Sequence, residues 1–352
     1  YDVSLITNMS THSNLLTDVL NNVKFHHVSI HRKISVYHDF IVLFELIKIF
    51  KQQKYDLVYS ISPKAGILSM FSSWVLGIPS RVHTFTGQVW VTSKGVERIL
   101  LKFIDKLIFY FSTYCLVDSH SQYNFLISKG IISNSKSRVL LNGSISGVDV
   151  NRFHQDRNIR DQIRSKLLLN NSEVVFLFIG RLNREKGVID LINAFNKILS
   201  AIESATLLLV GPDEDKIKKH VSTLPYRYRK FIKTIDYTSS PEKYMMASDI
   251  LCLPSYREGF GSVIIEAAAC GIPAIGSRIY GITDAIDHNI TGVLINNNKE
   301  LQDAMVKLAR DKNLRLSLGD NARKRALSDF SQENVIDAFV SFIDSCVTND
   351  KI

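Results

Sequence analysis

Residues 249–273 read DILCLPSYREGFGSVIIEAAACGIP, and this stretch decides the fold. An apolar run ends at Pro254, a loop with two glycines follows, and an apolar stretch of helical length then stops at Gly271 and Pro273. A buried strand, a glycine loop and a helix in this order are typical of an α/β domain with a parallel sheet. Because such sheets bind ligands at the carboxyl ends of their strands, the loop is predicted to lie in a binding site.

The loop EGFG (258–261) is suited to hold an anion. Gly259 and Gly261 have no Cβ, so the backbone can approach a ligand closely. The unpaired N–H groups of Gly261, Ser262 and Val263 at the start of the helix would then form an anion site.

Two carboxylates, Glu258 and Glu266, flank this loop eight positions apart. A carboxylate accepts two hydrogen bonds at once, which suits the paired hydroxyls of a ribose or a hexose. The ordinary alternative is a helix-capping loop with two solvated glutamates, and this segment alone leaves that alternative open.

A second cluster lies in FLFIGRLNREKGVIDLINAF (176–195). It places Arg181 and Lys186 just past a buried strand, and Gly187 opens the next helix. Arg offers a planar fork to phosphate oxygens and Lys a mobile positive charge. Alone the motif could be an exposed turn, but together with the glycine loop it indicates a clamp for a pyrophosphate.

Strand patterns alternate with helical patterns along the whole chain, which predicts two doubly wound α/β domains with Rossmann-like sheets facing a cleft. We expect an N-terminal domain over residues 1–160, a C-terminal domain over 161–330, and a helix over 331–352 that crosses back to the first domain. The polar stretch 149–172 is interpreted as the linker. Further strands are expected at 3–7, 114–119, 205–211, 231–237, 272–277 and 291–296. A strand that runs into a turn is expected at 56–62, 80–87, 138–144 and 174–182.

Composition narrows the class of protein. The chain has 352 residues, of which 45% are apolar and 22% charged, as in a globular protein. No apolar run reaches the roughly 20 residues of a membrane span. The four cysteines are scattered, which predicts buried thiols in a reducing cytosol and no metal site.

The net charge of +9 leaves two interpretations open. The basic residues are not interleaved with aromatic ones in a recognition motif, so nucleic acid is not expected as a partner. An anionic membrane surface or a phosphorylated substrate remains, beside an ordinary basic surface. An apolar stripe at helical spacing is interpreted as core rather than as a membrane anchor; it comprises Leu100, Phe103, Leu107, Tyr110 and Phe111.

Four segments carry a family resemblance: GRLNREKG (180–187), LLLVGPDED (207–215), the Glu258–Glu266 element and NGSISGVDVNRF (142–153). With them the chain resembles the family 4 glycosyltransferases, which are retaining enzymes of the GT-B fold. Two further segments, SPKAG (62–66) and HTFTGQVW (83–90), resemble bacterial transferases that extend undecaprenyl-diphosphate-linked glycans for surface polysaccharide such as O-antigen or capsule.

The resemblance implies a role for each site residue. Arg181 and Lys186 would bind the donor diphosphate and stabilise it as leaving group, and Glu258 would bind the transferred sugar, so these three are the expected catalytic residues. Glu266 would bind the ribose. The backbone of the loop from Gly259 through Phe260, Gly261, Ser262 and Val263 would contact sugar and phosphates, and the segment near Asp236 and Tyr237 would hold the base.

It also implies the reaction and its setting. A hexose or N-acetylhexosamine would pass from a nucleotide sugar, in the UDP form, to a lipid-linked glycan, with retention by front-face attack and without metal or other cofactor. The enzyme would be cytoplasmic and peripheral on the cytoplasmic face of the inner membrane. The alternatives are a GT-B phosphorylase or epimerase, and an inactive GT-B scaffold in a polysaccharide assembly complex.

The chain departs from the family pattern in the first half. Where many relatives carry a histidine near the reacting sugar, this chain has Thr86, and His83 three residues earlier is expected to be packed in a strand. His120 and Lys64 are weaker candidates for the acceptor side. The first strand and its glycine-rich acceptor loop are expected to be missing, because the sequence begins at Tyr1 with a strand pattern, as a fragment would.

Overall fold

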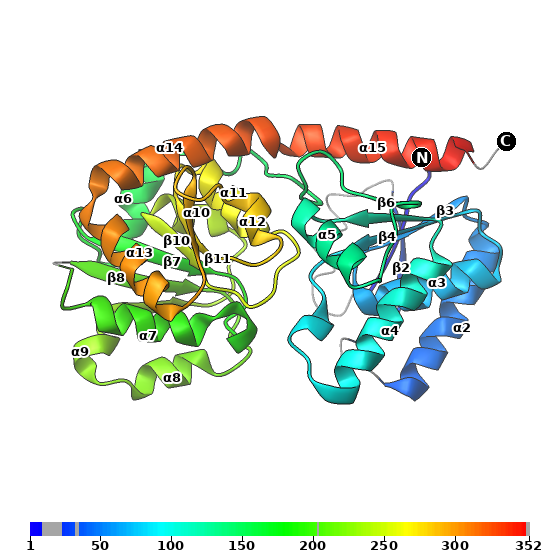
Figure 1. Cartoon of the computed structure of the whole chain (residues 1–352), viewed down its shortest axis with the longest axis horizontal. Helices are drawn as coiled ribbons and strands as arrows, with labels where there is room; N and C mark the ends of the chain where they lie inside the picture. The colour runs from blue at the N-terminus through cyan, green and yellow to red at the C-terminus, as the bar shows by residue number, and fades with distance from the viewer. Residues whose placement is uncertain (9–22, 32–34, 203, 350–352) are drawn as a thin grey trace.

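The computed structural model describes residues 1–8, 23–31, 35–202 and 204–349, which form two α/β units side by side. Each unit has its own hydrophobic core, one built on the first sheet and one on the second. Two long helices, α14 (Lys312–Asp329) and α15 (Gln332–Asn349), run along one side of both units (Figure 1).

The first unit is built on a parallel sheet in the order β3-β4-β5-β6. A separate parallel pair, β1 and β2, lies beside it, with Ser4 opposite Lys24. The strands of this unit are β1 (Ser4–Thr7), β2 (Lys24–His27), β3 (Leu57–Ser60), β4 (Ser80–Phe85), β5 (Tyr114–Val117) and β6 (Ser137–Arg138). Its helices are α2 (Val36–Gln53), α3 (Pro63–Val75), the short η1 (Val89–Val91), α4 (Gly95–Phe111) and α5 (His120–Ser128).

The strand and turn expected over 138–144 is mostly turn, because β6 ends at Arg138. Leu141, Gly143 and Ser144 all have positive φ angles, of 47°, 96° and 69°. A backbone with three left-handed residues cannot continue an extended strand, so this segment turns toward the second unit.

The second unit has a six-stranded parallel sheet in the order β12-β11-β10-β7-β8-β9. Read from β9, the strands of the unit follow the doubly wound order 3-2-1-4-5-6, and the order reverses between β7 and β10. The strands are β7 (Val174–Ile179), β8 (Ala205–Val210), β9 (Ile232–Ile235), β10 (Ile250–Leu253), β11 (Ala274–Ser277) and β12 (Gly292–Ile295). The shorter helices are η2 (Arg184–Lys186), α7 (Val188–Ile198), α8 (Ile217–Thr223), α9 (Tyr226–Arg229), α10 (Pro241–Met246), α11 (Ser262–Ala269), α12 (Ile282–Ala285) and α13 (Asn298–Arg310).

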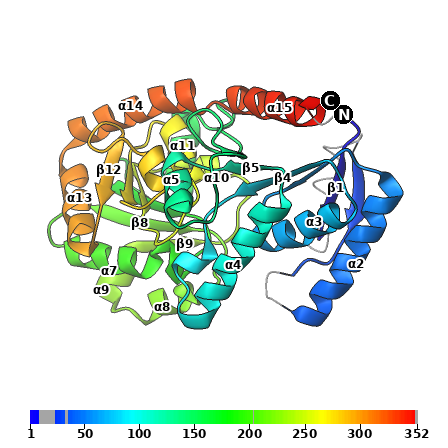
Figure 2. The ribbon, with the colours of Figure 1, turned by 45° about the vertical axis from the view of Figure 1, so that its right-hand side comes forward.

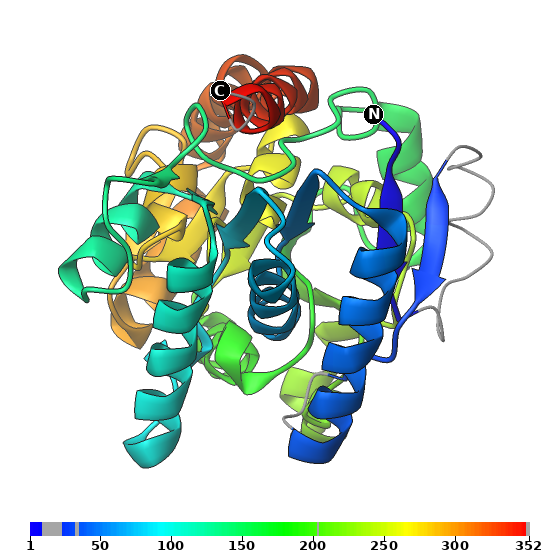
Figure 3. The ribbon, with the colours of Figure 1, turned by 90° about the vertical axis from the view of Figure 1, so that its right-hand side faces the viewer.

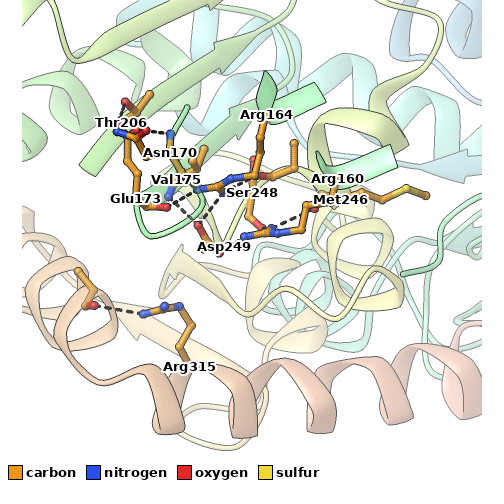
Figure 4. Close-up of polar contacts among 12 residues, drawn as sticks. Arg160, Arg164, Asn170, Glu173, Val175, Thr206, Met246, Ser248, Asp249 and Arg315 are labelled. Carbon is orange, nitrogen blue, oxygen red and sulfur yellow. Dashed lines mark hydrogen bonds and ion pairs between the residues drawn. The ribbon is translucent and has the colours of Figure 1, made fainter. Parts of the chain in front are cut away.

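The stretch 149–172 is not a simple linker, since it contains the helix α6 (Arg157–Lys166) packed against α10. Arg164 lies fully buried and donates to the carbonyl oxygens of Ala247, Asn170 and Glu173. Its guanidinium also pairs with Asp249 at 3.4 Å (Figure 4). A charged sequence therefore forms part of the second unit, because a buried hydrogen-bond network compensates its arginine.

Helix α15 packs on the outer side of the first sheet. Phe342 and Cys346 form a small core with Val82 of β4 and Leu116 of β5. The hydroxyl of Ser80 donates to the carbonyl oxygen of Cys346 at 2.7 Å. The last helix of the chain thus contacts the first unit, as Figure 2 also shows.

The chain passes between the two units at two places that lie side by side. Val148 donates to the carbonyl of Phe330, and Gln332 donates to the carbonyl of Val148, at 2.8 and 2.9 Å. Gly147 has a φ of 63°, and a Cβ there would lie 2.8 Å from the oxygen of Phe330. The two backbone segments that connect the units are therefore held in direct contact.

Candidate active site

One cavity lies between the two units at the point where the strand order of the second sheet reverses. Its volume is about 240 Å³. The first unit contributes the ends of β4 and β5, and the second unit contributes the segments after β7 and β10. The lining residues are Thr86, Gly87, Asp118, Arg181, Glu185, Lys186, Arg257, Glu258, Gly259, Phe260, Gly261 and Ser262.

Lys186 and Glu258 meet inside this cavity. The Lys186 Nζ lies 2.5 Å from Glu258 Oε1, and the two side chains are only 20% and 12% exposed. Ser255 donates to the same carboxylate oxygen at 2.9 Å. Gly187, with a φ of 70°, makes this approach possible, because a Cβ there would lie 2.0 Å from the carbonyl oxygen of Pro254.

Arg181 lies at the mouth of the cavity, directly after β7. Its guanidinium pairs with Glu214 at 3.0 Å, and the side-chain amide of Asn183 donates to the same carboxylate oxygen at 2.9 Å. About one third of the Arg181 side chain is exposed. The two cations from the segment after β7 therefore lie on the same cavity wall as the loop 258–262.

The glycine loop is held between the two units. A Cβ on Gly259 would lie 2.8 Å from both the Asp118 carboxylate and the amide nitrogen of Gly87, so only glycine fits there. Gly261 has a φ of 82° and precedes α11, whose first turn begins at Ser262. Phe260 is buried and packs edge-on against Phe330 with ring centroids 5.2 Å apart, so its backbone, not its ring, is available to a ligand.

Val263 and Glu266 lie further along α11, outside the lining of the cavity as the described residues define it. Burial raises the pKa of Glu266, and the nearby Arg152 partly opposes that shift. Arg152 is itself paired with Glu242 at 2.9 Å. The expected ribose contact at Glu266 thus lies beside the cavity, in a half-buried and polar environment.

The predicted acceptor-side residues do not all lie at the cavity. Thr86 lines the cavity, and its carbonyl accepts from the side-chain amides of Gln88 and Gln122. The side chain of His120 is hydrogen-bonded to the carbonyl of Leu141 at 2.9 Å, and Lys64 pairs with Asp39 at 2.6 Å. The structure does not bring His120 or Lys64 to the cavity lining.

His83 is packed, as the sequence predicts. Its side chain is buried, and Nδ1 lies 2.8 Å from the hydroxyl of Ser60. Burial lowers the pKa of His83 to about 3, so the ring is neutral at physiological pH. It packs so closely on Gly66 that a Cβ there would lie 2.5 Å from the ring.

A polar bridge that no sequence motif indicates crosses the cavity. Arg257 donates to Glu185 at 2.7 Å and to the carbonyl oxygen of Gly87 at 2.9 Å. Glu185 also accepts from the hydroxyl of Thr92 at 2.9 Å. Gly87 and Thr92 belong to the first unit, so these bonds connect the two units. Pairings between residues more than 70 positions apart leave no signal in a single sequence.

Asp118 was also missed. It follows the apolar strand β5 directly, a position at the carboxyl edge of the sheet that could have marked it. Its side chain is buried, and burial raises the pKa of the carboxyl to about 7, with a smaller contribution from the like charge of Glu258.

Comparisons with known proteins agree with this arrangement. Residues 1–119 match the family described as Glycosyl transferase 4-like, and residues 159–325 match Glycosyl transferases group 1. A capsular polysaccharide biosynthesis glycosyltransferase of Staphylococcus aureus, CapM, is 28% identical over 88% of this chain and 81% of its own length. A UDP-Gal:α-D-GlcNAc-diphosphoundecaprenol α-1,3-galactosyltransferase of Escherichia coli is 27% identical over 99% of this chain and 90% of its own.

Solved structures show the same fold. The structure of Anabaena HepE in complex with UDP-glucose superposes with a TM-score of 0.79 at 17% identity, over 97% of this chain and 91% of that one. Sucrose-phosphate synthase of Thermosynechococcus elongatus gives 0.79 at 22% identity, over 94% and 84%. The fold is therefore the GT-B fold, and the predicted fold class is confirmed. The family matches and the curated relatives make the chain a glycosyltransferase of this type. It carries a Glycosyl transferase 4-like domain and a Glycosyl transferases group 1 domain, and its relatives include a glycosyltransferase of capsular polysaccharide biosynthesis.

Proposed function

We propose that this enzyme transfers a hexose or N-acetylhexosamine from a UDP-sugar to a lipid-linked glycan, with retention of configuration at the anomeric carbon. The observation that carries the proposal is the shared cavity. It places Arg181, Lys186 and the amides preceding α11 around one space at the carboxyl ends of β7 and β10.

This arrangement suits the departure of a nucleoside diphosphate. As the bond between the sugar C1 and the diphosphate oxygen breaks, its electron pair passes to the diphosphate. Arg181, Lys186 and the start of α11 would stabilise that growing negative charge more than they stabilise the ground state. An acceptor hydroxyl attacks C1 on the face that the diphosphate leaves. As the new C–O bond forms, the hydroxyl proton passes to a neighbouring oxygen, of the departing diphosphate or of a cavity carboxylate. These protein cations would act in place of a metal ion.

Glu258 is proposed to bind the transferred sugar, and its position on the cavity wall beside Lys186 supports this role. Its carboxylate keeps acceptor capacity after bonding to Lys186 and Ser255, because two oxygens offer about four lone pairs. Glu266 is proposed as the ribose contact, although it lies outside the cavity lining. The lipid-linked acceptor is proposed from the printed activity of the Escherichia coli relative.

The experiment is a donor screen with purified protein, read by UDP release with and without a lipid extract as acceptor. Arg181→Ala and Glu258→Ala should each lower turnover at least 100-fold while far-UV circular dichroism stays unchanged. Lys299→Ala, an exposed lysine in a surface pair, is the matched control and should keep full activity. Full activity in both cavity variants would refute the site. The configuration of the product, read by NMR, tests retention.

The enzyme is further proposed to bind the cytoplasmic face of the inner membrane. Within the described part of the chain, no helix is both long and apolar enough to span a bilayer. The predicted core stripe on α4 is partly wrong, however, because Leu100, Phe103 and Tyr110 are exposed while Phe111 is buried. Amphipathic surfaces of this kind bind lipid interfaces.

Two helices of the first unit each carry a group of exposed apolar residues. They are α2 and α4, which flank α3 and project beyond the rest of that unit in Figure 3. On α2 the exposed apolar residues include Tyr37, Phe40 and Phe44, and on α4 Val96, Ile99 and Phe103. Exposed basic residues lie at the amino-terminal end of α4 and on α8–α9, along the same lower edge of Figures 1 and 2; they are Lys94, Arg98, Lys216, Lys219, Arg227, Arg229 and Lys230.

Co-sedimentation with vesicles tests this surface. The wild type should bind vesicles that contain phosphatidylglycerol and not vesicles of phosphatidylcholine alone. The double variant Phe40→Ser/Phe103→Ser should bind at least fivefold less, whereas Leu316→Ser, an exposed leucine on α14, should bind as the wild type does. Equal binding by all three proteins would exclude this surface.

A further inference from the structure

Asp118 occupies the first unit's side of the cavity, opposite the expected donor residues. Its backbone is fully engaged, since its N–H donates to Phe85 at 3.2 Å and its carbonyl accepts from Ser144 at 2.8 Å. The side chain is only 7% exposed. The end of β5 therefore fixes the position of this carboxylate.

One oxygen of this carboxylate has unused bonding capacity. The backbone of Ile145 hydrogen-bonds to the carboxyl group, but Oδ1 has no partner among the described residues. A buried polar atom without a partner costs free energy, so such an atom on a residue that lines a polar cavity indicates a missing ligand group. Above its raised pKa the carboxyl is ionised, and the group must then be a donor, because an ionised carboxylate only accepts.

The surroundings of Asp118 indicate which donor this is. A Cβ on Gly259 would lie 2.8 Å from Asp118 Oδ2, so the carboxylate touches the glycine loop. Lys186 pairs with Glu258 and not with Asp118. A phosphate would be repelled by an ionised carboxylate that has no cation paired with it, whereas a sugar hydroxyl is neutral and donates.

We propose that Asp118 is an acceptor-binding residue that accepts a hydrogen bond from the reacting hydroxyl of the acceptor sugar. This inference rests on the proposed function. The bond to Oδ1 turns the O–H toward the first unit and leaves an oxygen lone pair facing the anomeric carbon held over the glycine loop. Correct orientation of the attacking atom is among the larger contributions an enzyme makes to a bimolecular transfer.

The test separates transfer from donor binding. Asp118→Asn keeps the shape of the side chain, but it can place an amide N–H where Oδ1 accepts. We expect its rate of transfer to a synthetic GlcNAc-diphosphate lipid to fall at least tenfold. Donor hydrolysis without acceptor, and the affinity for UDP, should stay within twofold of the wild type.

Asp105→Asn is the matched control. Asp105 is as deeply buried, and burial raises its carboxyl pKa to about 7 as well, but it accepts from Trp90 at 2.7 Å away from the cavity lining. This variant should keep both transfer and hydrolysis.

The pH profile adds a second readout. The titratable groups that face Asp118 are Glu258, which is paired with Lys186, and Tyr59; the backbone of Ile145 lies beside it as well. Because the hydroxyl needs an ionised acceptor, wild-type transfer should fall as pH drops below about 7, and acceptor-independent hydrolysis should lack this limb.

Transfer by Asp118→Asn within twofold of the wild type would overturn the inference. So would a parallel loss of transfer and hydrolysis, since that would place the residue on the donor. A wild-type protein that turns over no donor at all would refute the proposed function itself, and the inference with it.

Discussion

Replacing Asp118 by Asn should stabilise the first unit, and the gain should grow with pH. The carboxyl has a pKa of about 7 in the folded chain against 3.8 ordinarily, because burial disfavours its charged form. Between these values the folded state binds the proton more tightly than the unfolded state. The free energy of unfolding of the wild type therefore falls as pH rises from about 4 to about 7.

The two pKa values set the size of the effect. Each unit of pKa corresponds to about 1.4 kcal/mol, so the ionised Asp118 lowers stability by at most about 4 kcal/mol at pH 8. At pH 5 the same calculation gives at most about 2 kcal/mol. Asp118→Asn removes the titration and should recover most of each amount.

Urea unfolding at pH 5 and pH 8, followed by tryptophan fluorescence, measures this directly. The chain has two tryptophans, Trp74 and Trp90, and both lie in the first unit, so the signal reports that unit. The gain in free energy of unfolding of Asp118→Asn over the wild type should be larger at pH 8 than at pH 5. An equal gain at both pH values, or a loss at pH 8, would show that Asp118 is not a buried acid of raised pKa.

Three further predictions concern stability and domain closure. Lys186→Met should lower the free energy of unfolding by about 2–4 kcal/mol, because it leaves Glu258 buried without its charge partner. Adding Glu258→Gln should recover at least about 1 kcal/mol in a double-mutant cycle measured by urea unfolding. Strictly additive effects of the two changes would contradict the pairing. Arg257→Gln removes the bonds to Glu185 and Gly87 that connect the two units, so small-angle scattering should show a larger radius of gyration. Each unit should keep its free energy of unfolding to within about 1 kcal/mol. An unchanged scattering curve would count against that bridge. Phe342→Ala should destabilise the first unit by about 3 kcal/mol in the same fluorescence assay, and a loss below about 1 kcal/mol would mean that α15 contributes little to it.

Local sequence patterns predicted the second unit well. The runs VVFLFI and ATLLLV form β7 and β8, where every residue is buried, and a strand buried on both faces reads as a continuous apolar run. The loop 258–261 was placed correctly at a strand end because glycines and a following helix mark such a turn. Proximity of Lys186 to Glu258 followed from the rule that parallel strands end at one edge.

The remainder depended on contacts that a single sequence does not encode. Helix α6 was missed because its buried Arg164 looks like an exposed residue until Asp249 and three carbonyls surround it. The exposed side of α4 looked like core because apolar periodicity does not say what covers a face. Asp118 was missed because its importance comes from an absent partner, not from a motif.

The paired crossings at Val148 and Gln332 determine how the molecule can move. Two backbone segments bonded to each other act as a single pivot, unlike one flexible tether. The two units can then open and close by a hinge rotation about this pivot, with the largest displacement farthest from it, but they cannot slide past or rotate freely about each other. Each closure would therefore return the same side chains to the same opposite wall, so substrates can enter and leave without loss of alignment.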